Sequence, residues 1–241
     1  MMSSPTVSGS RRTKPGRGQL DRSALVGAAL KIADADGLDA VTIRRVAEHF
    51  GVTAMALYWH FASKDELLDA MGDHVLDSVL LPAAGENGSG SDWAQQLRDI
   101  LAALVEAFRA HPNVVELAAG RILTCEPGRE LSERTLGFLR GAGFDVDQAA
   151  AIAHRTLSTA IMLVTTEPGA ESDITALERE ARRSAKSAAI AALSADRFPN
   201  LRAAAVALTH CADEQTYYGD GIDLFIAGMR GLHAGRAPAP R

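Results

Sequence analysis

The spacing of apolar positions along the chain predicts helices throughout. Apolar residues recur at i, i+3, i+4 and i+7 in every long segment, and no apolar–polar alternation stands between hairpin turns. The predicted fold class is therefore all-α. The expected helices cover about 22–36, 43–50, 53–60, 63–79, a segment ending before Pro112, 113–124, 128–141, 146–166 and a polar stretch at 173–193, with two more after Pro199.

Small polar residues and glycines mark the ends of the first helices. Gly37 stands where a left-handed C-cap belongs, and Thr42 and Thr53 are suitable N-caps. Ser63 and Glu66 form the S-x-x-E pattern of a capping box. These signals limit the second and third helices to about eight residues each.

The second and third helices have the spacing of a helix-turn-helix, with a two-residue turn at Gly51–Val52. The same spacing also occurs in plain helix–helix packing, so the pattern alone leaves both interpretations open. The residues expected to face inward are Val46, Ala47, Val52 and Leu57, and those expected to face outward are Thr53, Ala54, Met55, Tyr58, Trp59 and His60.

Composition excludes a disordered or collagen-like chain, and the distribution of charge points to phosphate. The 241 residues are 47% apolar and 23% charged, and the net charge of −5 argues against nucleic acid. However, residues 1–64 hold nine Lys and Arg against five Asp and Glu, whereas the remainder holds 16 against 25. A basic end and an acidic remainder suit a protein that binds phosphates at one end only.

Several other classes of protein are not supported by the sequence. Cys125 and Cys211 belong to no C-x-x-C pair, no apolar run follows the basic residues near the N-terminus, and the longest uncharged apolar stretch, Leu157–Val164, is too short to span a bilayer. H-E-x-x-H, P-loop and G-x-S-x-G motifs are absent. We therefore expect a cytoplasmic protein with reduced thiols that is neither an enzyme nor a membrane protein and holds no cofactor or metal.

One run of residues carries a family resemblance. Val41–Ala70 reads V-T-I-R-R-V-A-E-H-F-G-V-T-A-M-A-L-Y-W-H-F-A-S-K-D-E-L-L-D-A, and its L-Y-W-H followed by K-x-x-L-L-D-A resembles the DNA-binding domain of the tetracycline-repressor (TetR) family. Leu81–Glu86, L-P-A-A-G-E, followed by Trp93, resembles the interdomain segment of the tetracycline-repressor-like subfamily with a TetR-type C-terminal domain. The implied organisation is a helix-turn-helix domain at 21–66 and a helical effector-binding and dimerisation domain at 67–234.

Two terminal segments complete this organisation. Residues 1–20 are rich in Ser, Gly, Pro and basic side chains, which predicts a flexible basic arm, and residues 235–241 form a flexible tail. The arm is either a solvated extension or a contact to the minor groove or the phosphates of DNA.

The resemblance also implies which residues meet DNA. Arg44 matches a position that contacts bases or phosphates, and its guanidinium can pair with guanine O6 and N7. Ala54, Met55 and Ala56, like Ile43, depart from the subfamily's polar or proline residues and can touch only thymine methyl groups, so a different operator is expected. Trp59 contacts DNA or packs inside the domain. The full expected set is Thr42, Arg44, Arg45, Thr53, Ala54, Met55, Ala56, Tyr58, Trp59, His60 and Lys64.

The second domain is expected to form a homodimer on a palindromic double-stranded operator. The segment 149–164 is apolar on nearly every side, and the terminal helix carries a second apolar stripe. Either helix could instead belong to the core of one protomer. The expected interface residues are Ala150, Leu157, Ile161, Ile222, Phe225 and Met229.

A small-molecule effector is implied as well. Leu80 stands near the subfamily's metal-coordinating histidine and cannot ligate a cation, so a fairly apolar effector without magnesium is expected. His154 either lines the pocket or is a hydrogen-bonded core histidine. The expected pocket residues are Ile100, Leu104, Leu117, Arg121, His154 and Ser158.

These features together predict a sequence-specific DNA-binding transcriptional regulator, a homodimeric repressor that its effector releases from the operator. The alternative is an all-α small-molecule-binding protein with a weak or vestigial DNA-binding head.

Overall fold

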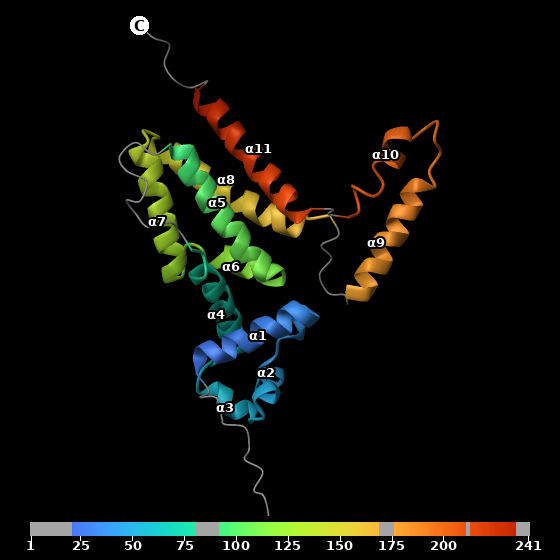
Figure 1. Cartoon of the computed structure of the whole chain (residues 1–241). Helices are drawn as coiled ribbons and strands as arrows, with labels where there is room; N and C mark the ends of the chain where they lie inside the picture. Colours follow the sequence, from blue (N-terminus) through green and yellow to red (C-terminus); the bar gives the residue numbers. More distant parts are fainter. Residues whose placement is uncertain (1–20, 81–91, 169–175, 211–212, 235–241) are drawn as a thin grey trace, which may run out of the picture.

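The computed structural model describes residues 21–80, 92–168, 176–210 and 213–234, and every regular element within these ranges is helical (Figure 1). The all-α prediction is therefore confirmed. The predicted arm at 1–20, the predicted tail at 235–241, the segment 81–86 and Cys211 lie outside the described residues.

The helices follow the order expected from the sequence. In chain order they are α1 (Arg22–Asp36), η1 (Leu38–Ala40), α2 (Ile43–Phe50), α3 (Ala54–Tyr58), α4 (Lys64–Asp77), α5 (Trp93–Ala110), η2 (Pro112–Val114), α6 (Val115–Arg121), α7 (Glu126–Gly141), α8 (Val146–Thr165), α9 (Ala176–Ala191), α10 (Pro199–Ala203) and α11 (Glu214–Ala234).

The first three α-helices form a small head at one end of the molecule (Figure 1). The Thr42 hydroxyl accepts a hydrogen bond from the Arg45 amide at 3.1 Å, and Gly51 adopts the left-handed conformation that ends α2. The C-cap expected at Gly37 differs, because its positive φ of 82° is combined with ψ of 164°, outside the left-handed helical region. The third helix stops at Tyr58 and does not continue through His60.

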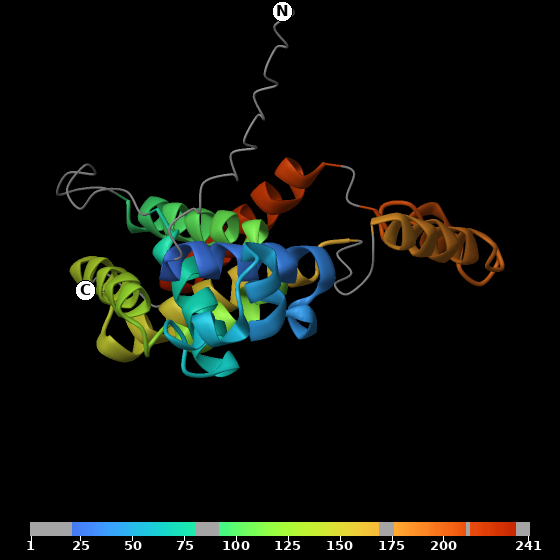
Figure 2. The same cartoon turned by 90° about the horizontal axis from the view of Figure 1, so that it is seen from below.

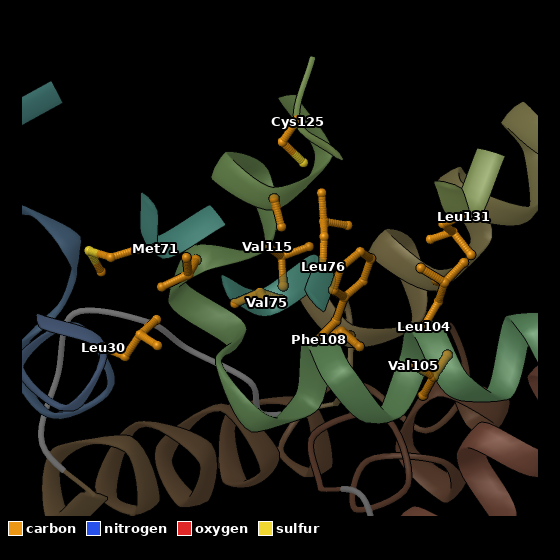
Figure 3. Close-up of a cluster of buried hydrophobic side chains, with 14 of the residues drawn as sticks. Leu30, Met71, Val75, Leu76, Leu104, Val105, Phe108, Val115, Cys125 and Leu131 are labelled. Carbon is orange, nitrogen blue, oxygen red and sulfur yellow. The ribbon is translucent and has the colours of Figure 1, made fainter. Parts of the chain in front are cut away.

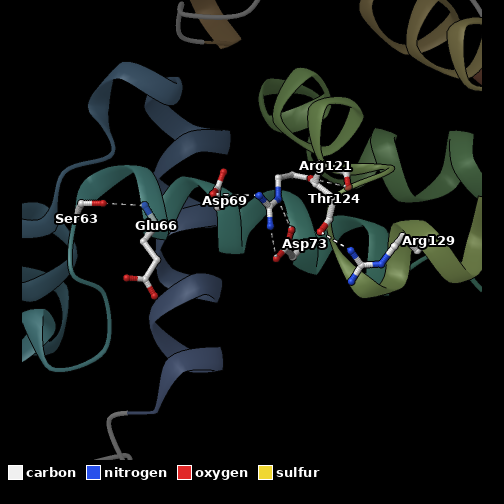
Figure 4. A network of polar contacts seen from close by, with 7 residues as sticks. All are labelled: Ser63, Glu66, Asp69, Asp73, Arg121, Thr124 and Arg129. Atoms are coloured by element: carbon white, nitrogen blue, oxygen red, sulfur yellow. Dashed lines mark hydrogen bonds and ion pairs between the residues drawn. The ribbon is translucent and has the colours of Figure 1, made fainter.

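The start of α4 is capped differently from the S-x-x-E prediction. Ser63 accepts from the Glu66 amide at 3.1 Å (Figure 4). The Glu66 carboxylate, however, accepts from the Ala62 amide at 2.7 Å and so misses the amide of Ser63. The same carboxylate pairs with the Arg22 guanidinium at 2.9 Å, and the Ala62 bond and this guanidinium hold the pKa of Glu66 below its usual value. The ion pair between Arg22 and Glu66 therefore links the start of α1 to the start of α4.

A single hydrophobic core runs from the head into the larger helical body. Figure 3 shows Leu30 of α1, Met71 and Leu76 of α4 and Phe108 of α5 along this core, with Val115 of α6 beside them. All five side chains are buried. Helix α4 therefore belongs to both units, since it packs on α1 at one end and on α6 and α7 towards the other.

A second, polar connection joins the head to the body at the C-terminal end of α1. His111 Nδ1 lies 2.9 Å from an Asp34 carboxylate oxygen, and the Asn113 amide donates to the Ala33 carbonyl at 2.8 Å. His111 is the C-cap of α5, as its place before Pro112 predicted. The head is thus attached through α4 and again through α1.

Helices α5, α8 and α11 form the far side of the body. Gly221 of α11 lies so close to α8 that an added Cβ would come within 2.4 Å of the Leu163 side chain, and the Tyr218 hydroxyl donates to Glu167 at 3.0 Å. In Figures 1 and 2, α9 and α10 stand apart from this body. Across the described ranges, no helix combines the length and apolarity that crossing a bilayer requires.

Candidate nucleic-acid interface and ligand cavity

The exposed face of α3 and the turn after it carry three large side chains. Met55, Tyr58 and Trp59 are 69%, 50% and 87% exposed, whereas Leu57 between them is fully buried. Of the two interpretations left open for Trp59, packing inside the domain is therefore contradicted. Large apolar groups are costly to leave in water, so this face has the composition of a contact surface.

The polar side chains of α2, α3 and the start of α4 differ in whether they already have hydrogen-bond or ion-pair partners among the described residues. Arg44 is exposed, and within the described residues it bonds only to Glu48 one turn along, at 2.9 Å. Arg45 is paired with Asp36 of α1, which reduces its freedom to reach DNA. Among the described residues, neither Tyr58 nor Lys64 has a side-chain hydrogen-bond partner.

The remaining positions of the predicted DNA-binding set differ in their exposure. Thr42 and Thr53 are exposed, and the Thr53 hydroxyl makes no capping bond. Ala54, Ala56 and His60 are half-buried, and the His60 carbonyl accepts from Arg22 at 2.6 Å. Ile43 is buried in the core of the head. Its departure from the subfamily's pattern therefore affects packing, and Ile43 does not contact bases.

A cavity of about 320 Å³ lies between α5, α7, α8 and the turn that follows α6. Such a volume falls at the lower end of the range for small-molecule sites. The wall contains no Asp, Glu, Lys or Arg among the described residues. It is formed by Ile100, Leu104, Ile122, Leu123, Leu131, Ser132, Thr135, Leu136, Ala150, Ala153, His154, Thr156 and Leu157.

Only part of the predicted pocket lines this cavity. Ile100, Leu104 and His154 do so, and His154 is exposed, which contradicts its alternative as a core histidine. Ser158 is exposed on α8 outside the lining, and Leu117 and Arg121 face α4. Ala150 and Leu157, expected at the dimer interface, are in the cavity wall.

Arg121, at the end of α6, joins this helix to α4. Its Nε and Nη2 atoms donate to the two oxygens of Asp73 at 2.7 and 3.2 Å, and Nη1 donates to Asp69 at 3.1 Å (Figure 4). The bond to Asp73 raises the pKa of Arg121. At the same crossing, a Cβ on Gly72 would lie 3.1 Å from the Leu117 carbonyl, so α4 and α6 are in close backbone contact.

Cys125 lies near Arg121 and Asp73, and its thiol is not reactive. Its sulfur accepts from the Gly128 amide at 3.4 Å at the start of α7, and burial raises the pKa of the thiol. A thiol that stays protonated is a poor nucleophile. Cys125 is therefore a small buried capping residue.

Sequence reasoning missed the contribution of α7 to the cavity. Leu131, Thr135 and Leu136 follow helical spacing, which predicts an inward face but cannot separate solid core from cavity wall. Thr156 gave no signal either, since a single threonine in an apolar helix has many ordinary explanations.

The predicted interface stripe on α11 is used inside the protomer. Ile222 and Met229 are buried and Phe225 is half-buried in the described single chain, while Ile161 is half-buried on α8. These helices present a different set of large apolar side chains to solvent: Val146, Met162, Leu224 and Leu232.

Metal-binding groups do not gather in the described ranges. No three His, Cys, Asp or Glu side chains there lie close enough to hold an ion. Leu80, near the subfamily's metal-ligand position, is exposed at the end of the α4 segment.

Comparisons with known proteins agree with both halves of this arrangement. The family model "Bacterial regulatory proteins, tetR family" matches residues 25–71, and "Tetracyclin repressor-like, C-terminal domain" matches residues 84–232. An HTH-type transcriptional regulator of Saccharopolyspora erythraea is 33% identical over 55% of this chain and 53% of its own length, so the match spans about half of that relative.

Two further relatives extend the similarity. The tetracycline repressor protein class C of Escherichia coli is 30% identical over 64% of this chain and 70% of its own length. The crystal structure of the Streptomyces coelicolor TetR family protein ActR in complex with (S)-DNPA has a TM-score of 0.64 and 28% identity, covering 89% of this chain and 99% of that one.

Proposed function

Because the chain belongs to the tetracycline-repressor family of transcriptional regulators, we propose that it is a homodimeric repressor of a palindromic operator and that a small molecule bound between α5, α7 and α8 releases it. It acts on DNA in the cytoplasm and catalyses no reaction. The main support for this proposal is the exposed face of α3, where Met55, Tyr58 and Trp59 stand together with nothing from the described chain covering them.

Selection of genomic DNA fragments at physiological salt tests the DNA-binding half. We expect one or a few palindromic fragments to be enriched, with affinity that falls steeply as salt rises, because each phosphate contact releases counterions. Retention of no fragment above bulk competitor DNA would favour the alternative, a small-molecule-binding protein with a vestigial head. Apolar exposed groups on α3 also predict contact with thymine methyl groups, whereas Arg44 is suited to guanine.

The proposed dimer uses the outer faces of α8 and α11 from each protomer. Met162, Leu224 and Leu232 are each more than half exposed on these helices, and a second copy would cover them in a four-helix interface. Ile222 and Met229 then support the interface from beneath, since they already hold α11 to its own protomer.

Leu224→Glu is expected to convert the dimer into a monomer, because burying an unpaired carboxylate in an apolar interface is unfavourable. Sedimentation velocity at micromolar concentration measures the change. Leu80→Glu is the matched control: it places the same charge at an equally exposed leucine at the end of the α4 segment and should leave the mass unchanged. A wild-type monomer, or a Leu224→Glu dimer, would contradict the proposed interface.

We propose that Arg121 transmits the effector signal to the head. Ile122 and Leu123, the next residues in the chain, line the cavity, while Arg121 itself holds Asp69 and Asp73 of α4. A ligand that displaces this turn therefore changes the position of α4. Such coupling between two sites commonly amounts to about a fivefold to 150-fold change in affinity.

Arg121→Met is expected to reduce effector-induced release from DNA to less than threefold while leaving effector affinity within about twofold, because Arg121 is outside the cavity wall. DNA affinity is measured with and without effector, and effector affinity is measured by calorimetry. Arg129→Met is the control, since the partners of Arg129 in the described part of the chain, Glu126 and the Thr124 carbonyl, belong to its own segment. Undiminished release by the Arg121 variant would overturn the assigned route.

A further inference from the structure

The chemistry of the cavity wall restricts what the effector can be, and this restriction rests on the proposed function of the cavity. Within the described residues the wall has thirteen members, and the one ionisable side chain among them is His154. Because His154 is exposed, an ionised ligand surrounded by the other twelve wall residues would lose its hydration without meeting an opposite charge, at a large cost in free energy. The cavity is therefore suited to a molecule that is uncharged when bound.

The hydroxyl groups in the wall have a common feature. Thr135 donates to the Leu131 carbonyl at 2.8 Å, Thr156 to the Ile152 carbonyl at 2.9 Å, and Ser132 to the Gly128 carbonyl at 2.8 Å. Each proton is thus used within its own helix. The oxygen that remains can accept a hydrogen bond but has no proton left to donate.

Two of these hydroxyl oxygens are buried, so they depend more than the third on a hydrogen-bond donor from a ligand. Thr135 and Thr156 are only 5% and 1% exposed, and within the described residues no donor reaches either hydroxyl oxygen. Ser132 is half-buried, where water can supply a donor. Unused acceptors in an apolar wall favour a partner that brings its own O–H or N–H.

We propose that the effector is a neutral, largely apolar molecule that donates a hydrogen bond from a hydroxyl or N–H group to Thr135 or Thr156. A molecule of the same shape with only acceptors would face the oxygens without a proton between them. An acid would lack a counter-charge. The cavity wall therefore disfavours both an acceptor-only analogue and an acidic analogue of the effector.

Three probes of similar shape test this selection by isothermal titration calorimetry at pH 7: 1-naphthol, 1-methoxynaphthalene and 1-naphthoate. We expect naphthol to bind about fivefold to tenfold more tightly than the methyl ether, the gain that one net hydrogen bond gives. The carboxylate should bind more weakly than either. Equal affinity of naphthol and ether, stronger binding of naphthoate, or no binding of any probe would overturn the proposal.

Variants localise the preference. The double variant Thr135→Val/Thr156→Val, which keeps shape and removes both oxygens, should bring the naphthol-to-ether ratio close to one and leave ether affinity within about twofold. Thr165→Val is the matched control, because Thr165 makes the same bond to the Ile161 carbonyl at 2.9 Å but is exposed at the end of α8. A ratio that persists in the double variant contradicts the assignment.

Two safeguards keep the result specific to this cavity. A separate hollow of about 250 Å³, between the start of α8 and the end of α11, contains Arg155 and His233, so each titration is repeated in Arg155→Met to remove binding of the acid there. Ligand binding is read without DNA. Failure of the donor rule is therefore distinguished from failure of operator binding, which the fragment selection measures independently.

Discussion

Replacing Gly128 with alanine is expected to destabilise the protein by about 3 kcal/mol, because the new Cβ has no room. It would lie 2.3 Å from the Ile122 carbonyl oxygen and 2.7 Å from the Ile122 Cα, both of which are backbone atoms. Neither can move aside as a side-chain end could. The turn after α6 must therefore shift against the start of α7.

Thermal unfolding measures this effect. A loss of about 3 kcal/mol lowers Tm by roughly 6–12 °C in a chain of this size. Gly137→Ala is the control in the same helix: Gly137 is exposed, a Cβ there meets nothing within 4 Å, and alanine should raise stability by up to about 1 kcal/mol. If both variants melted within one degree of the wild type, the close contact between Ile122 and Gly128 would be refuted.

Arg44→Ala is expected to weaken operator binding by between about 30-fold and 10⁴-fold. A lost guanidinium–guanine pair commonly costs about 1–3 kcal/mol, and a dimer on a palindrome loses two of them. The ion pair between Arg44 and Glu48 opposes this contact only slightly, because both side chains are largely exposed.

Fluorescence anisotropy on the fragment selected at physiological salt measures the loss. Arg129→Ala removes an exposed arginine from α7, away from the head, and should change affinity less than twofold. Lys64→Ala should weaken binding to all sequences alike and make affinity less dependent on salt, as expected for a phosphate contact. An Arg44 variant that binds within twofold of the wild type would exclude base contact by this residue.

The head could be predicted almost completely from the sequence because its signals are local. Thr42 caps α2, Gly51 ends it in the left-handed conformation, and Leu57 is buried between Met55 and Tyr58 as the spacing predicted. Each of these depends on neighbours within a few positions. The deviations are local too: Gly37 differs in its ψ angle, and Glu66 accepts from the amide of Ala62, one position before Ser63.

The cavity could be predicted only in part, because its walls come from distant segments. Helical spacing correctly turned Ile100 and Leu104 inward, but it could not show that they face a cavity. Leu117, predicted in the pocket wall, instead lies where the backbone of α6 meets Gly72 of α4. The partners of Arg121 lie about 50 positions earlier in the chain. In the same way, the apolar stripe with Ile222 and Met229 could not reveal whether its burial was within one protomer or between two.

The two attachments of the head have a geometric consequence. One lies where Gly72 and Asp73 meet α6, and the other where Asp34 and Ala33 meet His111 and Asn113. A rigid body held at two separate points retains one easy motion, rotation about the line through them. In the proposed dimer, two-fold symmetry makes both heads turn by the same angle, so a single angle sets the distance between the two α3 helices. Operator binding and effector binding then favour different values of this one angle.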